Sequence, residues 1–104
     1  MNTITIFTAK LCPYSSQLKK DLESAKVVFI EKAVDEDIAN LVEMYNLTHK
    51  KATPIIKLVI GKEDFIINGY NETNKQKLWQ LIKSNPQQLV NEGRADSNRE
   101  TSSL

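Results

Sequence analysis

The sequence predicts an α/β protein with a four-stranded mixed sheet flanked by three helices. Four short runs of β-branched, aliphatic or aromatic residues are typical of strands, and three other segments have helical periodicity. Their order along the chain is strand, helix, strand, helix, strand, strand, helix. The 104 residues correspond to one domain with a modest core.

The first half of the chain begins with a strand, a helix and a second strand. Residues 3–7 form an apolar run, as a buried strand does. Residues 13–25 predict a helix whose inner face carries Leu18, Leu22 and Ala25. Residues 27–30 are β-branched or aromatic and predict the second strand. Because a helix joins the two strands, we expect them to be parallel with a right-handed crossover.

The second helix has the clearest amphipathic pattern in the chain. Asp35 is a suitable N-cap for it. Apolar residues recur at i, i+3, i+4 and i+7 and define its apolar face: Ile38, Leu41, Val42 and Tyr45. Asn46 is the expected end of the helix.

The second half of the domain consists of a hairpin and a helix. Residues 55–60 and 65–67 predict two strands, joined by a turn at residues 61–64. The last helix spans residues 72–84, with Leu78, Leu81 and Ile82 on its inner face and Trp79 at its border. This order of elements is the minimal thioredoxin-like layout.

The composition changes near the C-terminus. Pro86 marks the end of the last helix, so we place the domain at residues 1–86. Residues 87–104 form a polar C-terminal tail, which we expect to be disordered because it has few apolar residues.

The overall charge and the cysteine count exclude several classes of function. The chain has 14 Lys and Arg against 13 Asp and Glu, so no strong field attracts nucleic acid or an anionic membrane. A single cysteine forms no intramolecular disulfide and suits a reducing compartment. The sequence also shows neither a signal peptide nor a run of about 20 apolar residues. We therefore expect a cytoplasmic monomer.

The only cysteine, Cys12, lies between the first strand and the first helix. Pro13 suits the first helical position, since its missing N–H would be unused there. The free N–H groups and the dipole at the helix start then favour the thiolate, and Lys10 adds a positive charge nearby. A buried, inert cysteine is the alternative, but this placement favours a reactive, nucleophilic Cys12.

Three motifs in the chain resemble those of the glutaredoxins. Cys12-Pro13-Tyr14-Ser15 resembles their Cys-Pro-Tyr-Cys active site, with serine in place of the second cysteine. The segment from Thr48 to Pro54 resembles Thr-Gly-x-Arg-Thr-Val-Pro, which ends in a cis-proline, and the segment from Asn68 to Glu72 resembles a Gly-Gly-x-Asp-Asp turn. The similarity covers residues 3 to 85 and implies a glutathione-disulfide oxidoreductase with a thioredoxin-like fold.

The serine at the second motif position determines the expected reaction. Ser15 cannot resolve a mixed disulfide, because an alkoxide is not accessible at neutral pH, but it can donate a hydrogen bond to the Cys12 thiolate. An external thiol must resolve it, and the resemblance implies glutathione as co-substrate and glutathionylated or disulfide-containing proteins as partners. We therefore expect monothiol deglutathionylation without a metal. Ser15 is either natural or an engineered replacement of a resolving cysteine.

The resemblance also implies a glutathione site. Lys51 would contact the glycine carboxylate, the backbone of Thr53 would pair with the peptide, and cis-Pro54 would hold that edge open. The N–H groups at the start of the last helix would bind the γ-glutamyl carboxylate. The expected contact residues are Lys10, Tyr14, Lys51, Thr53, Pro54, Gly69, Asn71 and Glu72.

Other functions remain open at this point. One is a [2Fe–2S] carrier, in which two copies share a cluster through each Cys12 and two glutathiones, although Pro13 argues against it. Another is a thioredoxin-like electron donor to ribonucleotide reductase in a two-cysteine parent, favoured by Asn68 and Asn71 in place of the family's glycine and aspartate. A third is a redoxin-like scaffold without chemistry.

Overall fold

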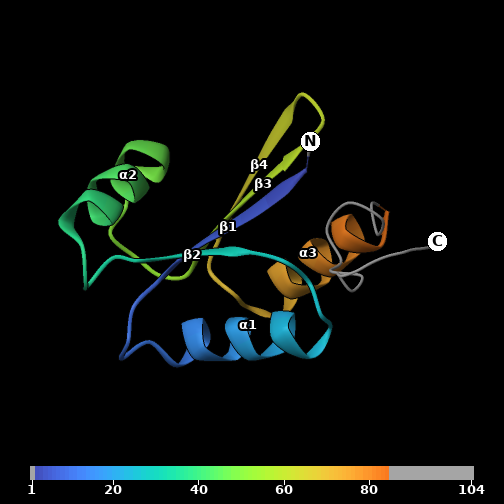
Figure 1. Cartoon of the computed structure of the whole chain (residues 1–104), viewed down its shortest axis with the longest axis horizontal. Coiled ribbons are helices and arrows are strands. Elements are labelled where there is room, and N and C mark those ends of the chain that lie inside the picture. Colours follow the sequence, from blue (N-terminus) through green and yellow to red (C-terminus); the bar gives the residue numbers. More distant parts are fainter. Residues whose placement is uncertain (1, 85–104) are drawn as a thin grey trace.

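The computed structural model describes residues 2–84, and these form a four-stranded sheet with helices on both faces (Figure 1). The elements, in chain order, are β1 (Thr3–Thr8), α1 (Pro13–Ser24), β2 (Ile30–Ala33), α2 (Ile38–Thr48), β3 (Ile55–Ile60), β4 (Glu63–Asn68) and α3 (Glu72–Ser84). The strand order is β2-β1-β3-β4. This architecture confirms the predicted thioredoxin-like fold.

The pairing of the strands makes the sheet mixed. Strand β1 lies at its centre, parallel to β2 and antiparallel to β3, and β3 is antiparallel to β4. The parallel pair is the one joined by the helical crossover α1, as expected. The hairpin turn is shorter than predicted, because Glu63 already pairs with Ile60 and only residues 61–62 remain between the strands. Gly61 adopts the positive φ of 64° that this tight turn needs.

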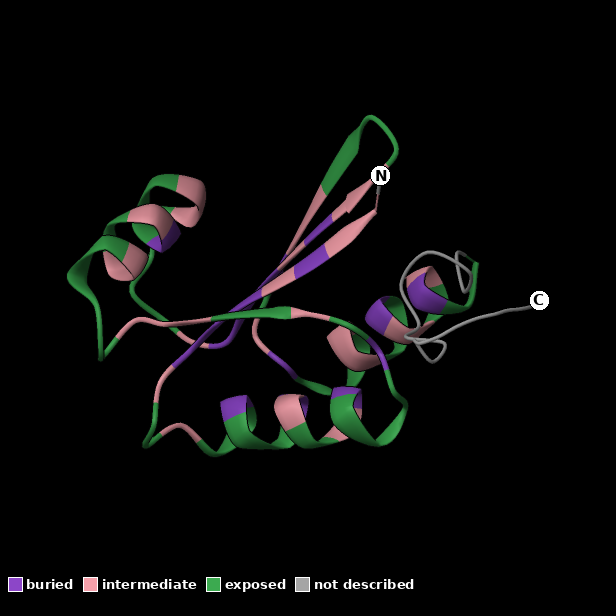
Figure 2. Cartoon of the chain, viewed as in Figure 1, coloured by how far each residue is buried: buried purple, intermediate pink, exposed green. Residues whose placement is uncertain are grey.

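Helices α1 and α3 cover one face of the sheet and α2 the other, which gives two cores (Figure 2). Alternate residues of β1 point to opposite faces, so that Ile6 joins one core and Phe7 the other. The larger core contains the predicted inner residues Leu18, Leu22, Leu78 and Ile82. Ala25, predicted on the same face, is instead exposed at the C-cap of α1.

The prediction of the second strand at residues 27–30 was wrong by several residues. Lys26 has φ 60° and turns the chain after α1, and the N–H of Val27 donates to the Leu22 carbonyl at 3.0 Å. Val27 is buried, so its apolar character reflects core packing and not regular pairing. Strand β2 begins only at Ile30, where the chain comes alongside Thr5 of β1.

The N-cap and the end of α2 also differ from the prediction. Asp37, and not Asp35, caps the helix: its Oδ1 accepts from the N–H of Ala39 at 2.9 Å. The helix continues beyond Asn46 to Thr48, and His49 ends it in the left-handed conformation with φ 58°.

The orientation of α2 corrects the predicted apolar face. Of the four residues that defined it, Leu41 packs against the core, but Ile38, Val42 and Tyr45 are exposed. Met44 is fully buried in their place, against Phe7 and Ile55. The physical reason is that α2 has apolar residues on more than one face, so periodicity alone does not determine which face is buried.

Two remaining expectations from the sequence concern the C-terminal tail and a membrane-spanning segment. Pro86 and the tail at residues 87–104 lie outside the described residues. Within residues 2–84, no helix is both long and apolar enough to cross a membrane.

Candidate active site

Cys12 occupies the position that its sequence context predicted. It is the N-cap of α1, with extended backbone angles, and Pro13 is the first helical residue. Its N–H donates to the Ala9 carbonyl at 3.2 Å, and its carbonyl accepts from the N–H of Ser16 at 3.2 Å. Cys12 is half-buried, and its N-cap position puts it at the helix start, where the first backbone N–H groups have no partner within the helix.

The surroundings of Cys12 lower the pKa of its thiol. Burial alone would raise this pKa, but hydrogen bonds from the Ser15 and Thr53 side chains, and from the backbone of Ser15 and Tyr14, outweigh it. These bonds stabilise the thiolate. Lys10, which we expected to contribute its charge, is not among the groups that lower the pKa.

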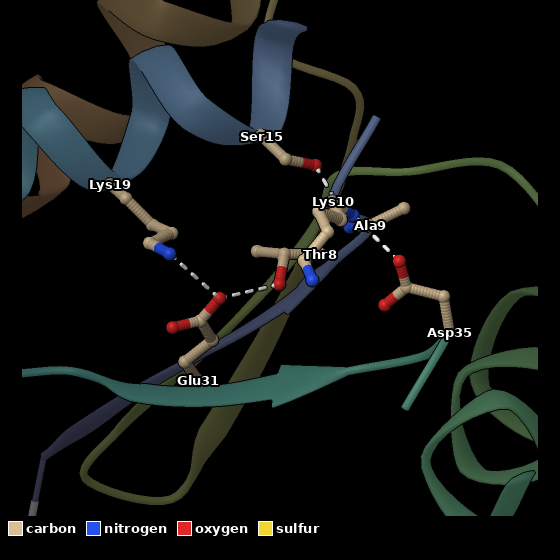
Figure 3. Close-up of polar contacts among 7 residues, drawn as sticks. All are labelled: Thr8, Ala9, Lys10, Ser15, Lys19, Glu31 and Asp35. Atoms are coloured by element: carbon tan, nitrogen blue, oxygen red, sulfur yellow. Dashed lines mark hydrogen bonds and ion pairs between the residues drawn. The ribbon is translucent and has the colours of Figure 1, made fainter. Parts of the chain in front are cut away.

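Ser15 is buried and hydrogen-bonded beside Cys12, and it is not a solvated first-turn serine. Its side chain is almost fully buried, with 1% exposure. Its Oγ accepts from the N–H of Ala9 at 3.3 Å (Figure 3). Since this bond uses the oxygen as acceptor, the hydroxyl proton is available for the Cys12 sulfur.

Thr53 and Pro54 lie next to Cys12, as predicted, although about 40 residues separate them from it in the sequence. The Cys12 thiol donates to the Thr53 carbonyl, with 3.5 Å between Sγ and oxygen. The peptide bond between Thr53 and Pro54 is cis, which confirms that prediction. The Pro54 carbonyl accepts from the N–H of Gly69 at 2.9 Å, so the loop before β3 is tied to the turn after β4.

A groove of about 210 Å³ opens beside Cys12. It is lined by Tyr14, Thr53, Pro54, Gly69, Tyr70 and Asn71. Five of these six residues were predicted as glutathione contacts from three separate stretches of sequence, and the fold brings them together. Asn71 also caps α3, because its Oδ1 accepts from the N–H of Asn74 at 2.8 Å.

Three other predicted contact residues do not line this groove. Lys51 is exposed in the loop before Pro54, and Glu72 is exposed at the first position of α3. Lys10 lines a separate cavity of about 200 Å³ between α1, β1 and β2. A role for these three in binding remains a prediction.

Ser15 also lines the cavity beside Lys10, and three polar residues of its wall, Thr8, Lys19 and Glu31, are paired with one another (Figure 3). Glu31 Oε2 accepts from the Thr8 hydroxyl at 2.7 Å and lies 3.2 Å from the Lys19 ammonium. These bonds connect β1, α1 and β2 beneath the active-site loop. We interpret this cluster as support for that loop.

Sequence reasoning missed Tyr70, which also lines the groove. The side chain is buried, and its hydroxyl donates to Asp21 Oδ2 at 2.6 Å and accepts from Trp79 Nε1 at 3.3 Å. Burial and the Asp21 carboxylate raise the pKa of Tyr70 to about 12. The only signal in the sequence was an aromatic residue inside a polar turn, and it does not identify Asp21 as the partner.

A thioredoxin-like fold with a low-pKa cysteine at the start of its first helix defines a thiol oxidoreductase. A model of the glutaredoxin family matches residues 4–63, more than half of the chain. The chain therefore belongs to the glutaredoxin family.

Known relatives agree with this assignment. An uncharacterized glutaredoxin-like 8.6 kDa protein in the rubredoxin operon of Clostridium pasteurianum is 28% identical over 75 residues, which cover 72% of this chain and 95% of that protein. The crystal structure of the thioredoxin-like protein BC3987 is 26% identical, with a TM-score of 0.62 over 76% of this chain and 99% of that one. A buckwheat glutaredoxin–glutathione complex is 19% identical, with a TM-score of 0.60 over 83% and 78% of the two chains. The last similarity shows the fold alone.

Proposed function

We propose that this protein is a monothiol, glutathione-dependent oxidoreductase that removes glutathione from mixed disulfides. The observation that carries the proposal is the position of Cys12 Sγ, 3.5 Å from the Thr53 carbonyl, beside the groove lined by five of the predicted contact residues. A peptide disulfide bound along Thr53 would bring its sulfur to Cys12, in the manner of an added strand edge.

The reaction has two exchange steps. The Cys12 thiolate attacks the glutathione sulfur of a mixed disulfide, so that a bond from Cys12 to glutathione forms and the substrate leaves as a thiolate that takes up a proton. A second glutathione, as thiolate, then attacks this glutathione sulfur, which releases Cys12 and glutathione disulfide. The substrate is reduced to its thiol, one incoming glutathione is oxidised, and the glutathionyl group from the substrate leaves with it as glutathione disulfide. Ser15 takes no part in either exchange, but its hydroxyl stabilises the Cys12 thiolate.

The charges around the groove fit the two carboxylates of glutathione. The Lys51 ammonium is exposed three residues before Pro54 and forms no ion pair or hydrogen bond within residues 2–84. It is therefore available for the glycine carboxylate. At the other end, Asn71 places the start of α3 at the groove, where the N–H groups of the first turn suit the γ-glutamyl carboxylate.

The test is the mass of the protein after incubation with glutathione disulfide, together with its rate on glutathione mixed disulfides. We expect one glutathionyl adduct on the wild-type chain, none on Cys12→Ser, and loss of the adduct when reduced glutathione is added. Lys51→Ala should raise KM for a glutathione mixed disulfide but not for the matching cysteine mixed disulfide, and Lys62→Ala in the β3–β4 turn is the control. Equal rates on the two disulfides would refute glutathione dependence.

A further inference from the structure

Helix α2 has an apolar surface that no other element within residues 2–84 covers. Its inner residues Met44 and Leu41 pack on the sheet, whereas Ile38, Val42 and Tyr45 are 71%, 52% and 43% exposed. These three residues recur at i, i+4 and i+7, so they form one continuous strip, which we call the α2 stripe. Large apolar side chains gathered on one exposed face are a typical feature of interaction surfaces.

Charges of opposite sign lie at the two ends of the α2 stripe. Asp35, Glu36 and Asp37 precede the helix, and Lys50 and Lys51 follow it. Within residues 2–84, the side chains of Glu36, Lys50 and Lys51 form no ion pair or hydrogen bond. Acidic residues before a helix and basic residues after it also stabilise the dipole of that helix. This effect does not explain why apolar residues of α2 face outward.

We propose that the α2 stripe is a self-association surface, on which a second copy of this chain packs its own α2 antiparallel to the first. In this arrangement the acidic end of each helix lies over the basic end of the other, so both pairs of ends attract. The two helix dipoles also oppose each other favourably. Val42, near the middle of the stripe, would lie close to the two-fold axis.

The charges at the two ends of the α2 stripe favour a second copy of this chain as the binding partner. A two-fold interface requires one surface that is complementary to itself. The α2 stripe with its flanking segments has this property, because the acidic residues lie on one side of Val42 and the basic residues on the other. The contact is small, with one helix from each copy, whereas stable complexes bury roughly 1,200–2,000 Å². We therefore expect a weak, closed dimer. This differs from the monomer that the sequence predicted and needs neither iron nor glutathione.

Sedimentation of the reduced, iron-free full chain tests the proposal, from about 10 µM to about 1 mM, which spans the Kd range of weak complexes. We expect a monomer–dimer equilibrium in the wild type. Val42→Glu should keep the chain monomeric, and it suits a helix because Glu is a better helix former than Val. Val28→Glu is the matched control, because Val28 is equally apolar and 53% exposed but lies outside α2. It should dimerise like the wild type.

A charge-reversal pair tests the antiparallel orientation independently of Val42. Glu36→Lys alone should weaken the dimer, and adding Lys50→Glu should restore it, because the two positions face each other across the interface. A wild type that stays monomeric at every concentration would overturn the proposal. A dimer that Val42→Glu leaves intact, or that Val28→Glu abolishes equally, would overturn it as well. Failure of the charge pair to restore association would exclude the antiparallel arrangement.

Discussion

The backbone N–H of Lys10 donates to Oδ2 of Asp35 at 2.8 Å, across 25 positions of sequence (Figure 3). The bond ties the loop before Cys12 to the connection between β2 and α2. The backbone of Ala9 in the same loop makes two further hydrogen bonds: its N–H donates to the Ser15 Oγ, and its carbonyl accepts from the N–H of Cys12. Asp35 therefore positions the Cys12 loop and does not cap α2.

Replacement of Asp35 by alanine should raise the pKa of Cys12. The bonds that lower this pKa depend on the geometry of the loop, and Asp35→Ala removes its anchor. The cost in stability should be about 1 kcal/mol, low for a bond to a charged group because the carboxylate is exposed. The measurement is the rate of Cys12 alkylation against pH, with chemical unfolding for stability.

The control for this variant is Asp37→Ala. It removes the N-cap of α2 and should also cost about 1 kcal/mol. It should leave the alkylation profile of Cys12 unchanged, because Asp37 makes no bond to the active-site loop. Equal shifts of the profile in both variants would show that general destabilisation, and not positioning, moves the Cys12 pKa.

Removal of the Ser15 hydroxyl should make Cys12 less acidic. The wild-type alkylation midpoint should lie below about 8.5, the value for a free cysteine, and Ser15→Ala should move it upward. Ser16→Ala is the control, since Ser16 is exposed and is not among the groups that lower the Cys12 pKa. A wild-type midpoint at or above that of a free cysteine would refute the low-pKa thiolate.

The lowered pKa of Cys12 also makes stability depend on pH. The native state loses the thiol proton at lower pH than the unfolded state does, so ionisation favours folding. This contribution is fully present above the unfolded pKa, about 8.5, and is lost as pH falls through the lowered native pKa. The difference in unfolding free energy between the wild type and Cys12→Ser should therefore grow with pH across that window. A difference that is constant with pH would contradict the shift.

A thiol at the second motif position should create a two-cysteine enzyme. Ser15→Cys places a thiol one helical turn after Cys12, where it can resolve a mixed disulfide without glutathione. We expect a gain in the reduction of protein disulfides and little change on small glutathione mixed disulfides. Ser16→Cys is the control, and it should add no such activity. If Ser15→Cys leaves protein-disulfide reduction unchanged, the resolving position is not at Ser15.

The sequence predicted the order and type of every element, and the placement of Cys12 at the start of α1, because these depend on local patterns. It misplaced β2 because Val27 and Phe29 are apolar for packing on the core, whereas the pairing with β1 begins only at Ile30. The exposed stripe of α2 was missed because a helix with two apolar faces has no single preferred orientation. The partnership of Tyr70 with Asp21 joins residues 49 apart. Such a bond depends on how the turn between β4 and α3 packs against α1, which no local pattern encodes.

Replacement of Tyr70 by phenylalanine should weaken binding in the groove while leaving Cys12 reactivity intact. The variant removes the hydroxyl that Asp21 and Trp79 share, which should cost about 1–2 kcal/mol of stability. Because Tyr70 lines the groove, KM for a glutathione mixed disulfide should rise, whereas alkylation of Cys12 should be unchanged. Tyr45→Phe is the control, because Tyr45 is exposed on α2 and does not line the groove.

The titration of Tyr70 gives an independent measurement of the same network. In the native state its pKa is raised to about 12. The native state therefore keeps this proton above pH 10, where an unfolded tyrosine loses it. The resulting stabilisation is fully present below about pH 10 and is lost as pH rises toward 12. The difference in tyrosinate absorbance between the wild type and Tyr70→Phe should appear near pH 12; a difference that appears near pH 10 would mean that the Asp21–Tyr70 bond does not hold the groove in solution.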